Sequence, residues 1–283
     1  MKQIKETAYA KINLGLDILG KREDGYHEVS MIMQSVGLSD EVVISKGNGI
    51  QISCNLHNLS CGPDNLAYRA AALLAGHCNI IPNVHIALNK KIFLAAGLAG
   101  GSTDAAAVLR ALNALHTAGL TDDELCEIGL KLGADVPFCL RGGTMLAQGI
   151  GEELSLLPDM PHCWVVLCKP PFAVPTKEVY QEIDSVDILE HPDNKGMMAA
   201  LNQEDYEGVC AYLSNVMETV TAAKRRQIGE IKSFLAENGA DGTLMSGSGP
   251  TVYGLFSDES RAKTAAKMLR RRFADTFLTE TCN

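Results

Sequence analysis

A run of glycine and hydroxyl residues that leads into an alanine-rich segment constrains this chain more than any other feature. From Ala95 to Ala106 the sequence reads AAGLAGGSTDAA. A helix N-terminus has unpaired N–H groups and a partial positive charge, and glycines before it let a ligand approach the backbone closely. The run therefore indicates either an anion site suited to phosphate or a tight turn that enters a packed helix.

The spacing of this run matches neither of the two common nucleotide-binding loops. No Lys follows Gly101, which excludes G-x-x-x-x-G-K-[ST], and the glycines do not follow G-x-G-x-x-G. No cation lies between Lys91 and Arg110. Backbone amides, the helix end and a metal ion would therefore have to hold an anion here.

The overall composition limits the classes of partner. The net charge is −9, which argues against nucleic acid and against an anionic membrane. The first residues do not resemble a signal peptide, and no apolar run is long enough to span a bilayer. We expect a cytoplasmic protein, a monomer or weak homodimer, that acts on small molecules.

Nine cysteines raise the question of a zinc site or disulfides. The best metal candidate, Cys54 with His57 and Cys61, fits no common zinc pattern, and no C-x-x-C pair occurs. Reduced thiols in loops and core are the favoured interpretation, so we expect no metal bound by the protein alone.

Strands and helices are predicted to mix without strict alternation, which favours an α+β fold. The 283 residues suffice for two domains, and prolines at 158 and 161 suggest a boundary between 1–157 and 158–283. Strands are expected at 3–18, 31–38, 41–45, 84–88, 144–148, 164–168 and 252–256. Helices are expected at 64–76, from the glycine run to 117, at 121–133, 204–216, 221–237 and 258–273.

Two charged residues in apolar surroundings are candidates for chemistry. Asp135 lies between Ala134 and Val136, at an expected helix-to-strand junction, and a partly desolvated carboxylate suits a general base. It could equally cap a turn or a helix. Lys11 lies in an apolar strand, either on a solvated edge face or as a buried ammonium that steadies developing negative charge.

Tyr26 and His27 form a further candidate pair in a polar turn. An aromatic face and an imidazole could bind a heteroaromatic ring. Such a pair is also common on ordinary surfaces, so the local sequence leaves both readings open.

Taken together, several segments resemble the small-molecule kinases of the galactokinase, homoserine kinase, mevalonate kinase and phosphomevalonate kinase superfamily. The resemblance is closer to the family that acts on 4-diphosphocytidyl-2-C-methyl-D-erythritol in non-mevalonate isoprenoid (terpenoid) biosynthesis. It covers about residues 5 to 256. The matching segments, besides the glycine run, are Ala10–Leu14, Asp24–Glu28, Leu132–Phe138, Met245–Thr251, Lys169-Pro170 with Thr176 and Tyr180, and Asn215-x-x-Glu218.

This resemblance implies a two-domain kinase, with an N-terminal ATP-binding domain and the active site in the inter-domain cleft. It implies that Asp135 takes the proton of the substrate hydroxyl and that Lys11 positions that hydroxyl and the phosphate. Tyr26 and Tyr180 would enclose the cytosine, His27 would read its edge, and Asn13 and Thr176 would also bind substrate. ATP, with Mg²⁺, would lie on Phe93, Leu94, Ala95, Ala96, Gly97, Leu98, Ala99, Gly100, Gly101, Ser102 and Thr103.

The chain departs from the family pattern at two positions. Phe93 stands where proline is usual, and Ala99 stands where glycine is usual. If the loop needs a positive φ at Ala99, the strain is about 1 kcal/mol, and we expect altered nucleotide affinity. The alternatives are a homoserine or mevalonate kinase, which lack the Tyr26-His27 pair, and a non-catalytic ATP-binding protein.

Overall fold

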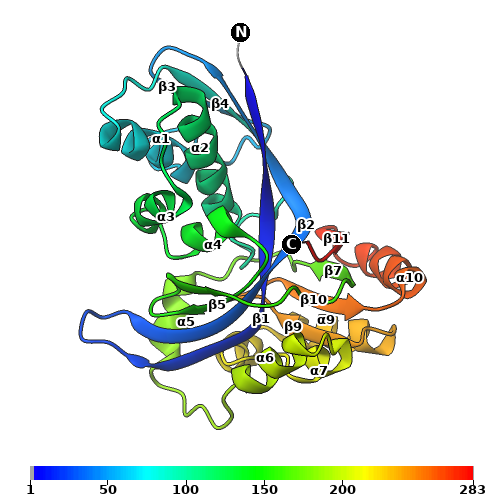
Figure 1. Cartoon of the computed structure of the whole chain (residues 1–283). Helices are drawn as coiled ribbons and strands as arrows, with labels where there is room; N and C mark the ends of the chain where they lie inside the picture. Colours follow the sequence, from blue (N-terminus) through cyan, green and yellow to red (C-terminus); the bar gives the residue numbers. More distant parts are fainter. Residues whose placement is uncertain (1–2, 283) are drawn as a thin grey trace. The chain divides into compact units, whose positions relative to one another are not determined.

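The computed structural model describes residues 3–282 and divides into two compact units (Figure 1). Unit 1 comprises Met1–Ala10, Ser39–Ile92 and Ala99–Gly142; unit 2 comprises Lys11–Leu38, Phe93–Leu98 and Gly143–Asn283. The expected cut between 157 and 158 does not coincide with this division. The reason is that strands β1 (Ile4–Lys21) and β2 (His27–Lys46) each contribute to both units.

Unit 1 is a small sheet covered by helices. Residues Glu41–Lys46 of β2 pair antiparallel with β4 (Val84–Asn89), and β3 (Ile50–Cys54) pairs parallel with β4. Helices α1 (Leu66–His77), α2 (Gly100–His116), α3 (Asp122–Leu130) and α4 (Asp135–Arg141) complete the unit.

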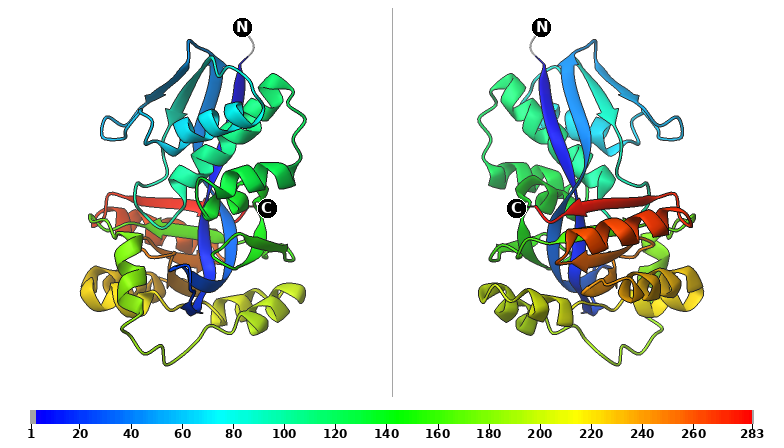
Figure 2. Two further views of the ribbon diagram at one scale, coloured as in Figure 1. Left: turned by 90° about the vertical axis from the view of Figure 1, so that its left-hand side faces the viewer. Right: turned by 90° about the vertical axis from the view of Figure 1, so that its right-hand side faces the viewer.

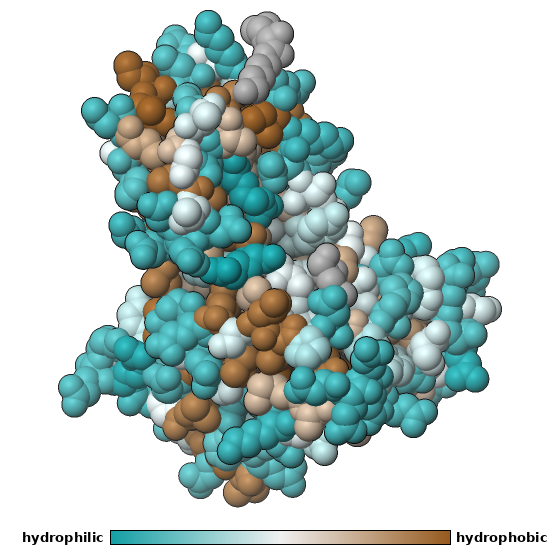
Figure 3. All heavy atoms as spheres, in the orientation of Figure 1, coloured by the Kyte–Doolittle hydropathy of each residue, from teal (hydrophilic) through white to brown (hydrophobic). Residues whose placement is uncertain are grey.

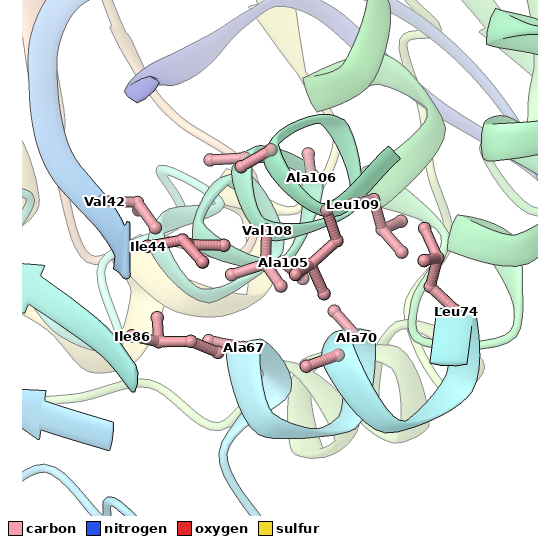
Figure 4. Close-up of a cluster of buried hydrophobic side chains, with 14 of the residues drawn as sticks. Val42, Ile44, Ala67, Ala70, Leu74, Ile86, Ala105, Ala106, Val108 and Leu109 are labelled. Atoms are coloured by element: carbon pink, nitrogen blue, oxygen red, sulfur yellow. The ribbon is translucent and has the colours of Figure 1, made fainter. Parts of the chain in front are cut away.

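Small side chains form the core between α1 and α2 (Figure 4). Ala67 and Ala70 of α1 face Ala105 and Val108 of α2, and all four are fully buried. Alanine has the highest helix propensity and lets two helices approach closely. The alanine-rich sequence after the glycine run therefore accounts both for the helix and for its packing.

Unit 2 is built on a four-stranded antiparallel sheet, in the order β11 (Thr276–Glu280), β7 (Trp164–Cys168), β10 (Val252–Phe256) and β9 (Gly242–Met245). Helices α9 (Arg226–Glu237) and α10 (Glu259–Arg270) pack on it, and Figure 2 shows α10 alongside β11. The remaining elements are β5 (Thr144–Gln148), β6 (Glu153–Leu156), α5 (Thr176–Ile183), α6 (Asn194–Asn202), α7 (Tyr206–Ala211), β8 (Ser214–Asn215) and α8 (Glu218–Lys224).

The α+β class predicted from the pattern is confirmed, as are the strands expected near 84–88, 144–148, 164–168 and 252–256. The capping box that opens α3 at Thr121 is also confirmed. The expected strands at 31–38 and 41–45 are wrong as separate elements, because β2 runs through both. Asn65, not Asp64, caps α1. The helix expected at 204–216 ends at Ala211, before β8, and the helix expected at 221–237 is divided between α8 and α9. The elements that were not predicted are β3, β6, β8, β9, β11, α4, α5 and α6.

Hydrophilic side chains cover most of the face shown in Figure 3. Within residues 3–282, none of the helices combines the length and hydrophobicity needed to cross a bilayer. All nine cysteines are free thiols.

Helix α2 begins in an unusual way. Its N-cap residue, Ala99, has φ 58° and ψ 25°, in the left-handed region, and no side chain caps the helix. The condition considered for Ala99 in the sequence analysis, a positive φ at this position, is therefore met. An L-residue there is strained by about 1–2 kcal/mol.

A buried charge cluster holds the start of α2. The Lys90 ammonium donates to Asp40, to Asp104 and, at 3.0 Å, to the carbonyl of Gly100. Asp40 also accepts from the backbone N–H of Lys91 and, at 2.8 Å, of Ile92. The cluster thus ties the end of β4 to the first turn of α2.

This cluster contains two carboxylates for one ammonium. Burial, with the Asp40 charge as a further cause, raises the pKa of Asp104 to about 7, although Lys90 opposes the shift. Oδ1 of Asp104 is buried and has no hydrogen-bond partner within the described residues. The Asp104 carboxylate therefore takes up a proton more readily than an ordinary aspartate does.

The strained backbone at Ala99 predicts how a glycine at this position would change the stability of the protein. Ala99→Gly relieves about 1–2 kcal/mol of left-handed strain in the folded state. It also favours the unfolded state by about 0.5–1 kcal/mol, because glycine gives the unfolded chain more conformational freedom. We expect the free energy of unfolding, measured in urea, to rise by about 0.5–1 kcal/mol.

The control is the same substitution at Ala114, which is exposed in the last turn of α2. There glycine should lower the free energy of unfolding by about 1 kcal/mol, because no strain is relieved. A loss of stability in Ala99→Gly equal to that in Ala114→Gly would contradict the interpretation.

Candidate active site

The glycine run contributes residues to both units. Phe93–Leu98 belongs to unit 2, whereas Ala99–Thr103 belongs to unit 1 and forms the start of α2. The first helical N–H groups have no side-chain cap, and Gly101 is exposed. An uncapped and accessible helix N-terminus is a favourable place for an anion.

Gly97 occupies a place that no other residue could take. Its φ is +73°, and a Cβ would lie 2.2 Å from the carbonyl oxygen of Ser246. The Ser246 hydroxyl donates to the Gly97 carbonyl at 2.9 Å. The backbone of the glycine run is thus in direct contact with the second glycine-containing segment, Met245–Thr251.

Lys11 is a buried ammonium, not part of a solvated edge face. Only 4% of its surface is exposed, and Nζ donates to Oδ1 of Asn13 at 2.7 Å. Its backbone N–H donates to the Leu98 carbonyl at 3.3 Å. Strand β1 therefore places Lys11 and Asn13, two of the predicted site residues, beside the glycine run within unit 2.

Asp135 is the first residue of α4 and is half-buried. The strand expected after it is wrong, because Pro137 lies in the first helical turn, where its missing N–H has no partner to lose. Within residues 3–282 the structure shows no hydrogen-bond or ion-pair partner for its carboxylate. A capping role is not seen, and an unpaired, half-buried carboxylate remains available for chemistry.

His27 is buried and bound by a carboxylate that the sequence reading missed. Its Nε2 lies 2.6 Å from Oδ1 of Asp184, whose Oδ2 accepts from Lys21 at 2.6 Å. Hydrogen bonds from Lys21 and His27 lower the pKa of Asp184, which therefore stays an acceptor. Nε2 must then carry the proton. Asp184 lies in an acidic stretch without a clear pattern, so no local signal marked it.

The other predicted substrate residues lie around the same part of unit 2. Tyr26 is 60% exposed, and Tyr180 stacks on His27 with ring centroids 5.0 Å apart. Thr176 opens α5, and its hydroxyl lies 2.9 Å from that of Ser248. The structure thus brings Tyr180 to His27 and Thr176 to the 245–251 segment.

Comparison with known proteins identifies the two parts of the chain. The GHMP kinases N terminal domain family matches residues 65–143, and the GHMP kinases C terminal family matches residues 197–275. The two matches lie on either side of residue 157.

Individual relatives give a narrower assignment. The chain is 44% identical over 279 residues to 4-diphosphocytidyl-2-C-methyl-D-erythritol kinase of Clostridium beijerinckii, with 98% of this chain and 100% of that protein covered. A solved structure of 4-(cytidine 5'-diphospho)-2C-methyl-D-erythritol kinase superposes with a TM-score of 0.86 at 33% identity, covering 99% of this chain and 100% of that one.

A more distant match shows the breadth of the fold. Homoserine kinase of Cytophaga hutchinsonii superposes with a TM-score of 0.79 at 19% identity, covering 100% of this chain and 95% of that one. At that identity the likeness concerns the fold alone. The full-length relatives decide the assignment: this chain belongs to the GHMP kinase family, among the 4-diphosphocytidyl-2-C-methyl-D-erythritol kinases.

Proposed function

We propose that this chain transfers the γ-phosphoryl group of ATP to the 2-hydroxyl of 4-diphosphocytidyl-2-C-methyl-D-erythritol. The observation that carries the proposal is the 44% identity to a kinase of that name along the whole of both chains. The buried Lys11, the unpaired Asp135 and the uncapped start of α2 supply the groups that phosphoryl transfer requires.

The proposed ATP site is the run from Phe93 to Thr103. Its N–H groups at the start of α2 suit phosphate oxygens, which supports placing the triphosphate there. Because Ala99 is strained and Phe93 replaces the usual proline, we expect nucleotide affinity to differ from that of relatives with glycine and proline, without loss of activity.

Mg²⁺ is part of this proposal. Within residues 3–282, no three His, Cys, Asp or Glu side chains gather into a cation site. The ion would be held mainly by ATP phosphate oxygens, as is usual for Mg²⁺. When bound, Mg²⁺ neutralises part of the phosphate charge. The net charge of this chain, −9, does not attract phosphate by itself.

Asp135 is the proposed general base and Lys11 the proposed positioning cation. Asp135 takes the proton of the 2-hydroxyl as the oxygen bonds to the γ-phosphorus and the bond to ADP breaks. The Lys11 ammonium, held by Asn13, attracts the developing negative charge on the hydroxyl and phosphate oxygens. Because a tertiary alcohol is a crowded nucleophile, alignment supplies most of the rate enhancement.

His27 is the proposed reader of the cytosine edge. Since Nε2–H donates to Asp184, Nδ1 is the ring nitrogen that can accept from the cytosine 4-amino group. Tyr26 and Tyr180 would cover the two faces of the base, and Asn13 and Thr176 would contact the rest of the substrate. We propose a cytoplasmic monomer or weak homodimer that takes only small-molecule ligands.

The proposed activity is tested by measuring ADP formation with three acceptors in parallel. We expect turnover with 4-diphosphocytidyl-2-C-methyl-D-erythritol and none with homoserine or mevalonate, because neither offers a cytosine to His27. Turnover with homoserine or mevalonate alone would refute the substrate, and binding of ATP without any turnover would favour a non-catalytic protein.

Removing the proposed base should separate chemistry from binding. Asp135→Asn keeps the shape of the side chain and should lower kcat by a factor of about 10² or more, with little change in either KM. Asp122→Asn, at an exposed carboxylate in the first turn of α3, is the matched control. Steady-state kinetics with an unchanged kcat in Asp135→Asn would exclude this residue as the base.

Removing the proposed cytosine reader should affect binding instead. His27→Ala should raise the KM for the cytidine substrate about tenfold and leave kcat nearly unchanged, because the contact is remote from the transferred group. His77→Ala, at an exposed histidine in the last turn of α1, is the control. A loss confined to kcat would show that His27 acts in the chemical step.

A further inference from the structure

The segment Met245–Thr251, called here the 245–251 loop, holds one side of the glycine run. Ser246 donates its hydroxyl to the Gly97 carbonyl at 2.9 Å and presents its own carbonyl where a Cβ on Gly97 would collide. The next residue, Leu98, accepts from the Lys11 N–H at 3.3 Å. A shift of Ser246 would therefore move Gly97 and, one residue later, the contact with Lys11.

A second set of side chains fixes the 245–251 loop from behind. Asn215 donates from Nδ2 to two loop carbonyls, those of Met245 and Gly247, each at 2.8 Å. Its Oδ1 accepts from the backbone N–H of Met217 at 2.9 Å. One buried amide thus uses both its donor group and its acceptor, and it fixes the carbonyls of the two residues on either side of Ser246.

Glu218 and Thr221, which follow Asn215 in the sequence, complete this support. Glu218 accepts from the Met245 N–H at 2.6 Å and from Lys232 at 2.5 Å. Thr221 donates to the Ser248 carbonyl at 3.2 Å. Because Asn215, Glu218 and Thr221 follow one another at three-residue intervals, their side chains reach the same loop from one short segment.

Apart from Glu218, which is half-buried, the support is buried. Exposure is 5% for Asn215, 3% for Thr221 and zero for Ser246. Hydrogen bonds in such surroundings fix peptide orientation strongly, because a carbonyl that loses its donor has no water to replace it. Strand β1, which carries Lys11 and Asn13, is tied to the same region, since the Tyr253 hydroxyl donates to the Asn13 carbonyl at 2.8 Å.

We propose that Asn215 is a positioning residue for the ATP site, acting on Gly97 and Leu98 through Ser246 of the 245–251 loop. This inference rests on the proposed function in one respect, that the glycine run binds the ATP phosphates. It accounts for the Asn215-x-x-Glu218 pattern, to which the proposed mechanism gives no task.

The test is a double-mutant cycle with Asn215→Ala, Ser246→Ala and the double variant. Each single variant should raise the KM for ATP about tenfold, with the KM for the cytidine substrate unchanged within about twofold. Since both residues act through one contact with Gly97, the double variant should be no worse than the poorer single variant. Ser257→Ala, which removes a hydroxyl bond to Asp241 at the far end of β10, should behave as wild type.

Three outcomes would overturn the inference: additive effects in the cycle, unchanged affinity for ATP, or a fall in kcat alone. A fall in kcat alone is what a smaller fraction of folded protein would produce. If Asn215→Ala does not fold, Ser246→Ala decides, because it removes a single hydroxyl. Direct titration with ATP measures the same change in ATP affinity without an acceptor substrate. Failure of the wild-type protein to phosphorylate the cytidine substrate would therefore refute the proposed function without deciding this inference.

Discussion

The unpaired backbone N–H groups at the start of α2 are the constraint around which this chain is organised. No side chain caps them, and the strained Ala99 turns the chain so that they begin the helix. Lys90 fixes the first turn through the Gly100 carbonyl, balanced by Asp40 and Asp104. Burying one cation and two carboxylates carries a desolvation cost, which the contacts of Lys90 with both carboxylates oppose.

Each half of the glycine run is held by its own unit. In unit 1, the Thr103 hydroxyl donates to the Tyr9 carbonyl at 2.8 Å, in addition to the Lys90 contacts. In unit 2, Gly97 and Leu98 are held by Ser246 and by the Lys11 N–H. The two halves of the glycine run are thus each held by a few direct contacts within one unit.

Local sequence predicted the parts of this fold that local physics determines. The glycine run followed by alanines marked α2, Thr121 with Glu124 marked the cap of α3, and the small-residue segment 246–251 marked the start of the β10 strand. Local sequence could not reveal the Asp184 partner of His27, because 157 residues separate the two side chains. The division into two units also depends on contacts that are distant in the sequence, since β1 and β2 each contribute residues to both units.

Phosphoryl transfer from ATP to one defined hydroxyl is the central claim, and it is tested most directly by the ³¹P NMR spectrum of the product. Wild-type protein, ATP and 4-diphosphocytidyl-2-C-methyl-D-erythritol should give one new phosphomonoester, attached at the 2-oxygen, with one ADP formed for each. Phosphorylation at another hydroxyl, or release of inorganic phosphate in place of the ester, would contradict this account.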